Sequence, residues 1–576
     1  MRLSRLIRPT QALAPALAPA LGLAPALALV LALVLALLGS PACGDRPAPR
    51  LDAYFVRDGL ALAPAGQAAW RLLQGGQVVL AAGSKGVVAL PGGRYLAPVP
   101  WRPGESFRLE AGGQSLELFA PQRPSPLLVC TVELENLRPH GSQMGDAPDT
   151  EVCFSPQGDR LAVGTFTGRL LLVRVPSGEE VWSRKLPEGL VKRLAWGNLA
   201  GRQVLYVGEQ SPQGLVYCLD AADGAEIWRF DASRVLGRGS LAGDRRHAIY
   251  NLPGVYDLRV LPDGDLLLVA THGRFQGENF RHDCRVWRLG GTDGQVRWRW
   301  PREANFPYGI TWVGASAKGE TLAFMSFNTF GPQVAGPFQD GTLYCLDGSR
   351  GRERWRYQVP PLKPYYSRVG AWQAVSVSPR GRGILLGLND GRAMLFDAAA
   401  GARGPRWELP VGAPLMVGDL PVGAPVSYAR LSDEAAYLVT PGTTIPAGMQ
   451  TDQRTPQPHP HARHLFAYDW QGNLLWQHQT QGAAQGLALS PTGREVAVGV
   501  GASPAADDRN EFGLSLFRAG PARGKGPLLY HFATNGPAYY RLAISAGGRY
   551  LALTESPFTR DEGKTVQGSY RVLVIH

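Results

Sequence analysis

A tight turn that contains glycine, followed four residues later by tryptophan, recurs along this chain of 576 residues. In the two clearest copies, residues 217–228 and 344–355, the segment Tyr-Cys-Leu-Asp precedes the turn. Glycine permits a left-handed turn between antiparallel strands, and tryptophan is large enough to fill the gap between neighbouring blades of a ring. The repeat therefore predicts a β-propeller. The five full copies are Gly178/Trp182, Gly224/Trp228, Gly294/Trp298, Gly351/Trp355 and Gly472/Trp476, and a looser copy ends at Trp407.

A second pattern precedes each copy, an apolar strand, a short turn and another apolar strand, as in residues 152–161. The first strands of these units begin near residues 152, 194, 258, 310, 375, 429, 487 and 542. Their spacing suits four-stranded blades with loop insertions. The last unit lacks one strand, which the isolated strand at 127–134 would supply, so that the ring closes without an exposed edge. We expect an eight-bladed β-propeller over residues 123–576.

Residues 51–122 form a separate unit of short alternating strands divided by Gly-rich turns. This pattern predicts a small β-sandwich, immunoglobulin-like in character, joined to the ring through a Pro-rich segment at 121–126. The 71 glycines, 47 prolines and only 18% charged residues agree with an all-β protein that has many turns.

The first 42 residues have the character of a signal peptide, with a basic start and an uninterrupted apolar run at 26–39. Two interpretations of the following segment remain open. Ser40 and Ala42 satisfy the small-x-small rule of ordinary signal cleavage, whereas Cys43 can be the lipidated first residue of a bacterial lipoprotein with residues 43–50 as its tether. The usual lipoprotein signal has Leu where this chain has Ser40. Either way, we expect an exported protein of the bacterial cell envelope, anchored by lipid to a membrane or secreted.

The formal charge is +12, but no basic run is interleaved with aromatic residues, which disfavours a nucleic-acid partner. Five further cysteines are scattered, with no CxxC pair, which argues against a disulfide framework and against a zinc site. Cys218 and Cys345 occupy equivalent repeat positions and are expected to be small buried apolar residues.

The spacing Asp-x3-Gly-x3-Trp, as in Asp220, Gly224 and Trp228, resembles the repeat of the PQQ-type eight-bladed propellers. That superfamily includes quinoprotein dehydrogenases and the non-enzymatic propeller lipoprotein of the outer-membrane β-barrel assembly machinery. The resemblance covers about residues 123–576 and implies a fold rather than a function. Its catalytic members place a vicinal disulfide over the quinone, and this chain has no Cys-Cys, no CxxCH haem motif and no convincing calcium set. We therefore expect no PQQ and predict no other cofactor.

Long insertions fall in the loops between second and third strands and in the connections between blades, all of which emerge on one face of a propeller. One-sided insertion predicts a binding face. At the channel mouth, residues that begin the inner strands suit a polar ligand or peptide. They equally suit a ring that satisfies itself with salt bridges and water. These residues are Glu151, Arg193, Asp257, Trp312, Tyr428 and Arg541.

Two histidine clusters offer a contrasting hypothesis. His459, His461 and His464 have the spacing H-x-H-x2-H and could bind a transition metal, or they are incidental loop residues. A second group in a loop at 272–283 consists of His272, Glu278, His282 and Asp283. These residues could do acid–base work or bind a metal, but solvated loop side chains are the favoured interpretation. The preceding strand faintly resembles arylsulfotransferase propellers.

The leading hypothesis is a non-enzymatic envelope scaffold, a monomeric propeller whose long-loop face binds another envelope protein or a ligand. The alternative is a metal-dependent or arylsulfotransferase-like enzyme that uses the loop histidines.

Overall fold

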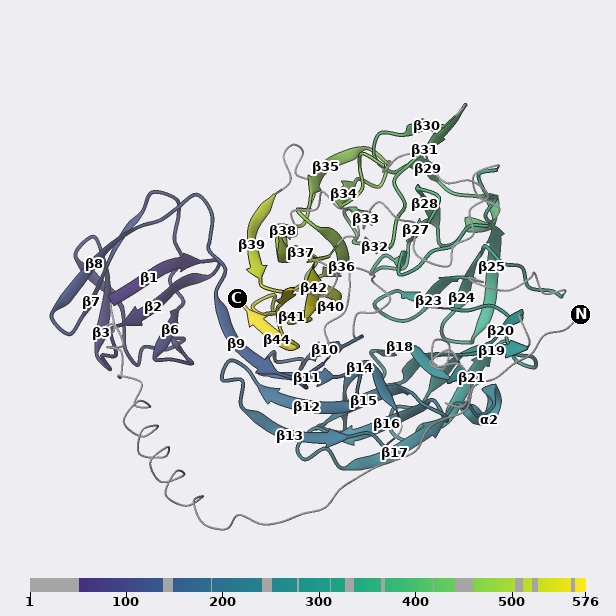
Figure 1. The fold of residues 1–576 in the computed structure, drawn as a ribbon, viewed down its shortest axis with the longest axis horizontal. Coiled ribbons are helices and arrows are strands. Elements are labelled where there is room, and N and C mark those ends of the chain that lie inside the picture. The colour runs from purple at the N-terminus through teal and green to yellow at the C-terminus, as the bar shows by residue number, and fades with distance from the viewer. Residues whose placement is uncertain are drawn as a thin grey trace, which may run out of the picture.

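The computed structural model describes residues 51–137, 149–187, 189–240, 251–276, 279–310, 312–326, 336–363, 368–417, 419–440, 459–502, 511–520, 527–560 and 565–576. The described chain is almost entirely β-structure, arranged as a propeller with a smaller domain beside it (Figure 1). The predicted all-β propeller class is confirmed. Within the described residues, no helix is long and apolar enough to span a membrane. The predicted signal segment and Cys43 lie outside the described residues.

After residue 127 the main described strands form six antiparallel four-stranded sheets and one eight-stranded sheet, β14 to β21, in which β15 and β18 pair only at Gln210 and Gly254. We divide that larger sheet into two groups of four strands and number the resulting groups as blades 1 to 8. In the blades whose first strand is labelled in Figure 1, that strand (β10, β14, β18, β32, β36 or β40) lies nearest the centre of the ring. Blades 1 to 4 are β10 (Glu151–Phe154), β11 (Arg160–Gly164), β12 (Arg169–Arg174) and β13 (Glu180–Lys185); β14 (Leu190–Leu199), β15 (Arg202–Gln210), β16 (Leu215–Asp220) and β17 (Glu226–Asp231); β18 (Gly254–Val260), β19 (Leu266–Gln276), β20 (Asn279–Leu289) and β21 (Val296–Trp300); and β22 (Gly314–Ala315), β23 (Thr321–Met325), β24 (Thr342–Asp347) and β25 (Arg352–Gln358).

Blades 5 to 8 complete the ring. They are β26 (Val375–Val377), β27 (Gly383–Gly387), β28 (Arg392–Asp397) and β29 (Trp407–Pro410); β32 (Tyr428–Leu431), β33 (Ala436–Thr440), β34 (His464–Tyr468) and β35 (Leu474–Gln479); β36 (Ala483–Leu489), β37 (Glu495–Gly501), β38 (Phe512–Arg518) and β39 (Leu528–Thr534); and β40 (Ala538–Ile544), β41 (Leu551–Glu555), β44 (Arg571–Ile575) and β9 (Leu128–Glu133). Short elements outside the blades are α2 (Ser233–Leu236), η3 (Gly401–Arg403), β30 (Leu415–Val417), β31 (Leu420–Val422), β42 (Phe558–Arg560) and β43 (Thr565–Gln567).

The ring is closed by pairing between segments more than 430 residues apart in the sequence. β9 lies antiparallel to β44, with Val132 opposite Val572 and Cys130 opposite Val574. β9 occupies the segment for which the sequence predicts a closing strand. This pairing leaves the last blade with four strands although only three of them come from the C-terminal end of the chain.

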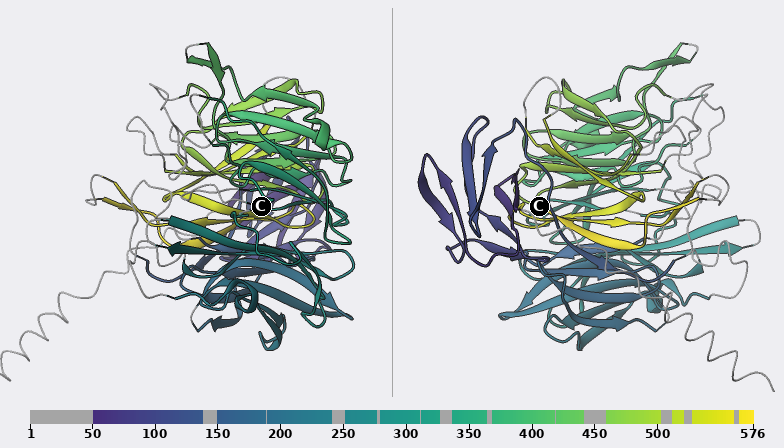
Figure 2. Two further views of the ribbon diagram at one scale, coloured as in Figure 1. Left: turned by 90° about the vertical axis from the view of Figure 1, so that its right-hand side faces the viewer. Right: turned by 60° about the vertical axis from the view of Figure 1, so that its left-hand side comes forward.

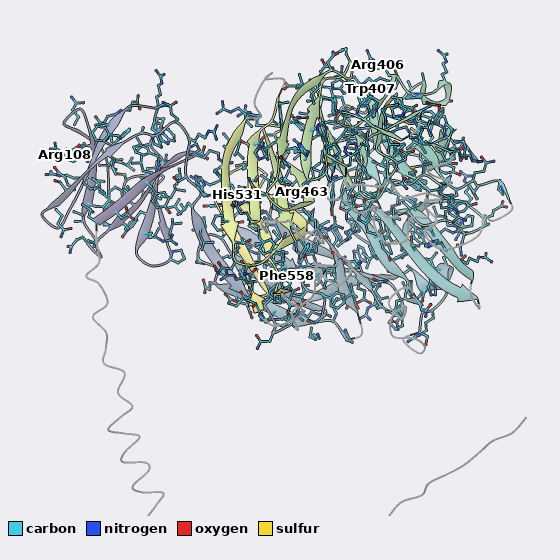
Figure 3. All side chains as sticks on the ribbon, turned by 45° about the horizontal axis from the view of Figure 1, so that its top comes forward. Arg108, Arg406, Trp407, Arg463, His531 and Phe558 are labelled. Atoms are coloured by element: carbon cyan, nitrogen blue, oxygen red, sulfur yellow. The ribbon has the colours of Figure 1, made fainter. Side chains whose placement is uncertain are left out.

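In most repeats the tryptophan packs against the turn glycine of the next blade. A Cβ on Gly294 would lie 2.7 Å from the Trp228 ring, and one on Gly351 would lie 2.5 Å from the Trp298 ring. The same tryptophans donate their indole N–H to a carbonyl of the next turn, Trp228 to Gly291 at 2.9 Å and Trp298 to Gly348 at 3.0 Å. Figure 3 shows Trp407, which ends this series, at the periphery of the ring, where its indole N–H donates to the Trp470 carbonyl at 3.2 Å.

Trp355 and Trp476 are buried more deeply than the other tryptophans of the repeat. Trp355 is 8% exposed and Trp476 is 2% exposed, whereas Trp228 and Trp298 are half-buried. Trp355 keeps the contact of the series, because its indole N–H donates to the Ala398 carbonyl of the next turn at 2.8 Å. These two tryptophans therefore belong to the buried core, whereas Trp228 and Trp298 remain partly exposed at the boundary between blades.

Trp476 also departs from the series in its contacts. In the described structure its indole N–H has no hydrogen-bond partner. The ring instead stacks on Phe517 of blade 7, with 5.7 Å between the ring centroids, and lies in an apolar cluster that blades 6 and 7 share. Trp476 therefore joins two blades through apolar packing, without the hydrogen bond to a turn that Trp355 makes.

Residues 51–119 form two four-stranded sheets, ordered β1-β2-β6-β5 and β4-β3-β7-β8. A shared core joins them, in which Leu62 of the first sheet and Trp70, Leu72 and Phe107 of the second are buried. The strands are β1 (Leu51–Val56), β2 (Gly59–Pro64), β3 (Trp70–Gln74), β4 (Gln77–Ala81), β5 (Val88–Leu90), β6 (Arg94–Ala97), β7 (Ser106–Ala111) and β8 (Gln114–Phe119).

This N-terminal domain packs on the ring where the ring closes. Val56 and Leu90 share one apolar cluster with Val129 of β9 and Val574 of β44. The backbone N–H of Ser125 donates to the Phe55 carbonyl at 2.8 Å, and the Arg57 guanidinium donates to the Arg549 carbonyl at 3.0 Å. The domain is therefore attached to blade 8 by contacts as well as by its linker.

Two predicted loops prove to be β-structure. Residues 272–276 and 279–283 extend blade 3 as a ribbon, in which β19 and β20 pair out to Gln276 opposite Asn279. The connection at 412–424 contains the β30–β31 hairpin. The described cysteines form no disulfide, and Cys218 and Cys345 are fully buried in apolar clusters, as the sequence predicts.

We expect Gly351→Ala to destabilise the ring more than a matched glycine substitution. The left-handed φ of +61° costs an alanine about 1–2 kcal/mol. The added methyl must also displace the Trp298 ring, and overpacking typically costs about 1–3 kcal/mol more. Urea unfolding followed by circular dichroism measures the sum.

Gly493→Ala is the control, because Gly493 has a similar φ of +69° but no atom within 4 Å of an added Cβ. Equal losses of unfolding free energy in the two variants would contradict the role assigned to the tryptophan contact.

Candidate binding site in the central channel

The inner strands of several blades direct charged side chains toward one another at the centre of the ring. These side chains surround a cavity of about 370 Å³. Five of the six residues predicted at the channel mouth line it, namely Glu151, Arg193, Asp257, Trp312 and Arg541. The sixth, Tyr428, is fully buried on β32, two residues before Arg430, which does line the cavity. Leucines of β14, β18, β36 and β40, with Pro491 and Ile544, supply much of the apolar wall.

Two carboxylates of the channel are held by arginines. The Glu151 Oε2 atom lies 3.1 Å from Arg541 Nε and 3.5 Å from Arg193 Nη1. Burial raises the pKa of Glu151, although both arginines oppose the shift. The Asp257 carboxylate lies 3.2 Å from the Arg259 guanidinium and accepts the backbone N–H of Val313 at 3.0 Å.

A third ion pair lies beside this group. Lys192 Nζ is 2.6 Å from Asp149 Oδ2. Burial opposes ionisation of Asp149, but Lys192, Arg541 and Arg193 outweigh it and lower the pKa of this carboxyl. Asp149 is therefore ionised whenever the ring is folded at ordinary pH.

Trp312, which precedes β22, is the common contact of three guanidinium groups. The Cζ atoms of Arg430, Arg259 and Arg541 lie 4.7, 5.1 and 5.4 Å from the centre of its ring. Cation–π attraction of this kind is worth about 0.5–2 kcal/mol for each pair. The tryptophan thus offsets part of the repulsion between three like charges.

Arg430 differs from its neighbours because, among the described residues, no carboxylate lies within 4 Å of its guanidinium. Its Nη1 donates only to backbone carbonyls, those of Ala429 at 2.8 Å and Gln373 at 3.4 Å. Burial, together with the charges of Arg259 and Arg541, lowers the pKa of Arg430 to about 9. The guanidinium is still charged at neutral pH, in surroundings that disfavour its charge.

The described channel is therefore positively charged overall. Its cations are Lys192, Arg193, Arg259, Arg430 and Arg541, and its carboxylates are Asp149, Glu151 and Asp257. Sequence reasoning missed Arg259 and Arg430. Each lies two residues after a predicted channel residue on the same strand, and residues two apart in a strand share a face. That periodicity could have identified both.

The three blade-6 histidines do not form the predicted metal site. Among the described residues, no group of three His, Cys, Asp or Glu side chains is arranged to hold a metal ion. His461 Nδ1 accepts the Ala413 N–H at 2.8 Å, His464 Nδ1 lies 2.8 Å from the Ala462 carbonyl, and His459 Nε2 lies 3.2 Å from the Val422 carbonyl. The His459 and His461 rings instead join blade 6 to the β30–β31 connection, whereas the His464 ring bonds within blade 6.

The blade-3 group is likewise structural in the described part of the chain. His272 is buried, with Nδ1 3.1 Å from the Leu236 carbonyl and Nε2 3.0 Å from the Asn251 carbonyl. Asp283 lies 3.3 Å from Arg274. Glu278 lies outside the described residues. The expectation that these are solvated loop side chains is wrong for His272 and Asp283, because the ribbon continues through them.

A larger cavity, of about 580 Å³, lies between blades 5 and 6. Its lining includes Arg382, Arg406, Asp433 and Trp470. Arg382 stacks over the Trp470 ring at 5.4 Å and lies 3.9 Å from Asp433. Arg382 pairs with Asp433 across the blade boundary and Arg406 is exposed to solvent, so the central channel remains the better candidate site.

Residues 166–443 match the family model described as outer membrane protein assembly factor BamB. This match confirms the resemblance to PQQ-like propellers for that part of the chain. BamB from Moraxella catarrhalis is 12% identical, with 78% of this chain and 100% of that chain covered and a TM-score of 0.45. Quinohemoprotein alcohol dehydrogenase from Comamonas testosteroni is 14% identical, with 78% and 76% covered and a TM-score of 0.47. No curated protein matches the sequence significantly.

Replacing Arg541 or Arg430 by an uncharged residue should have different effects on the free energy of unfolding. Arg541→Gln is expected to cost about 3 kcal/mol of unfolding free energy, because it leaves the buried Glu151 with one fewer counterion. Arg430→Gln should cost nothing or stabilise the fold, because it removes an unpaired cation from a positive cluster. Urea unfolding at pH 7 measures both.

The pH dependence provides a further check on Arg430. Its pKa of about 9 in the folded state lies below its ordinary value, so above pH 9 the unfolded chain binds this proton more tightly. Wild-type stability relative to Arg430→Gln should therefore rise as the pH increases beyond about 9. A difference that stays constant between pH 7 and pH 10 would contradict the lowered pKa.

Proposed function

We propose that this chain, a propeller whose residues 166–443 match the BamB family model, is a non-enzymatic scaffold that presents one face of its ring to another protein of the bacterial cell envelope. We infer an eight-bladed ring, with residues 51–122 as a small β-sandwich and residues 43–50 as a tether. The match to a family described as an outer membrane protein assembly factor supports a role in binding other proteins.

The observation that carries the proposal is the one-sided extension of the ring. The β19–β20 ribbon and the β42–β43 hairpin both connect second to third strands of their blades, and they project from the same side of the ring (Figure 2). The β30–β31 hairpin belongs to a connection between blades, which emerges on that side as well. Met416 on this hairpin is 58% exposed. Loops and hairpins gathered on one face of a rigid ring are a common form of binding surface.

Among the described residues, the opposite face gives no comparable surface. Its turns, such as residues 155–159 between β10 and β11, are short and close on themselves, with the Ser155 hydroxyl donating to Asp159 Oδ1 at 2.8 Å. The histidines that would serve an enzyme are bonded to backbone groups of neighbouring loops. These contacts favour a scaffold over the enzymatic alternative.

Shortening the loop at residues 441–458 to Gly-Ser-Gly should abolish capture of a defined protein partner in crosslinking pull-downs from intact envelopes. The loop connects β33 to β34, a second-to-third connection on the proposed binding face. Quantitative mass spectrometry of the crosslinked fractions provides the readout, with thermal unfolding as a check that the ring is intact.

An insertion of Gly-Ser-Gly after Lys318, in the β22–β23 turn of the opposite face, is the matched control and should retain the partner. Loss of the partner in both variants would indicate a folding defect. An unchanged partner in the shortened variant would reject the long-loop face as the contact surface.

We also propose that Cys43 carries the lipid anchor. Cys43→Ser should release the protein from membranes into the soluble envelope fraction and remove its labelling by a fatty-acid probe, since acyl chains supply the membrane affinity. Cys153→Ser, which alters a half-buried thiol in β10, should leave both unchanged. If the Cys43→Ser variant stays in the membrane fraction as the wild type does, lipidation of Cys43 is refuted and ordinary signal cleavage is favoured.

A further inference from the structure

We propose that the guanidinium cluster around Trp312 is a binding site for one oxyanion, a carboxylate or a phosphate group, held chiefly by Arg430 with help from Arg259 and Arg541. The site is distinct from the long-loop face of the proposed function, and its test does not depend on that function.

The charge balance of the channel supports an anionic ligand. Buried cations are normally paired, because transfer of an isolated charge out of water is costly. Glu151 is the counterion of Arg541, and Asp257 is the counterion of Arg259. For Arg430 the described residues provide only backbone carbonyl oxygens. An oxyanion would supply the counterion that the fold itself lacks.

Cation–π contact with Trp312 does not replace that counterion. The ring accepts three guanidinium groups at once, and the three cations repel one another, which contributes to the lowered pKa of Arg430. An anion placed among them would attract all three. It would bind by relieving a repulsion that already exists in the unliganded ring.

The cavity has donors of suitable chemistry. Arginine presents planar N–H groups that match the oxygens of a carboxylate or phosphate. Arg193, only 6% exposed, lines the cavity, and its Nε has no hydrogen-bond partner in the described structure. The cavity volume of about 370 Å³ accommodates a small anion without a change in the ring.

The cavity lining also contains apolar residues. Leu489, Pro491 and Ile544 line the same cavity as the arginines. Pro491 belongs to the turn after β36, so the lining continues from the channel toward the face opposite the long loops. This geometry fits an oxyanion carried on a short apolar stem as well as a free anion.

Isothermal titration calorimetry of the full processed protein, at constant ionic strength, tests the site with sodium phosphate and sodium hexanoate as separate probes. We expect saturable binding of at least one probe to one site, with a dissociation constant below about 10 mM. Stronger binding of hexanoate would identify a carboxylate on an apolar stem, and stronger binding of phosphate would identify a phosphate source. Failure of both probes to saturate would overturn the proposal.

The variants assign the binding to Arg430. Arg430→Gln should weaken it at least tenfold, and Arg430→Lys should weaken it less, because the charge is kept and the planar donor pair is lost. Arg234→Gln, whose side chain is 83% exposed and far from the cavity lining, should bind as wild type. Wild-type affinity in Arg430→Gln would overturn the proposal, and Arg430→Lys provides the test if the glutamine variant does not fold.

Discussion

The ring depends on the contact between the tryptophan of one blade and the turn glycine of the next. The contact repeats from Trp182 to Trp407. In each case a Cβ on the turn glycine would lie 3.3 Å or less from the indole, and the indole N–H donates to a carbonyl of the same turn. One residue pair thus fixes both the spacing and the orientation of neighbouring blades. Because the contact is formed at the outer strands, the centre of the ring is left to other side chains.

The contact changes where the ring closes. The turn glycine of blade 1, Gly178, faces Cys130 of β9 instead of a tryptophan, with the cysteine Cβ 3.2 Å from the position of an added methyl. The smaller side chain covers less apolar surface. Val56 and Leu90 of the N-terminal domain join the cluster that contains Cys130. The domain therefore contributes to closure of the ring at the one boundary where β-pairing joins distant parts of the sequence.

Much of the ring could be predicted because its signals are local. A glycine turn, an alternating strand and a tryptophan at fixed spacing need no knowledge of distant residues, and the inner strands β10, β14, β26 and β32 begin within four residues of their predicted starts. The sequence did not predict the blade-3 ribbon because the hydrogen-bond partners of its polar residues are distant in the sequence. The His272 ring, for example, bonds to the carbonyls of Leu236 and Asn251. The histidine spacing in blade 6 suggested a metal site for the same reason, because the hydrogen-bond partners of these histidines could not be identified from the motif. A motif shows which side chains are near one another, but it does not show that the Ala413 N–H and the Val422 carbonyl already occupy their nitrogens.

The positions of the channel residues could be predicted from the sequence, but the pairing of their charges could not. Any residue that begins an inner strand must approach the axis, which is why Glu151, Arg193 and Asp257 could be placed there from the sequence. Whether each charge finds a partner depends on several blades at once. Arg430 sits between Arg259 and Arg541 only because blades 3, 6 and 8 meet around Trp312. The tryptophan contacts that position the blades lie at the outer strands and do not depend on the charges in the channel. The propeller can therefore tolerate repulsion between the arginines at its centre.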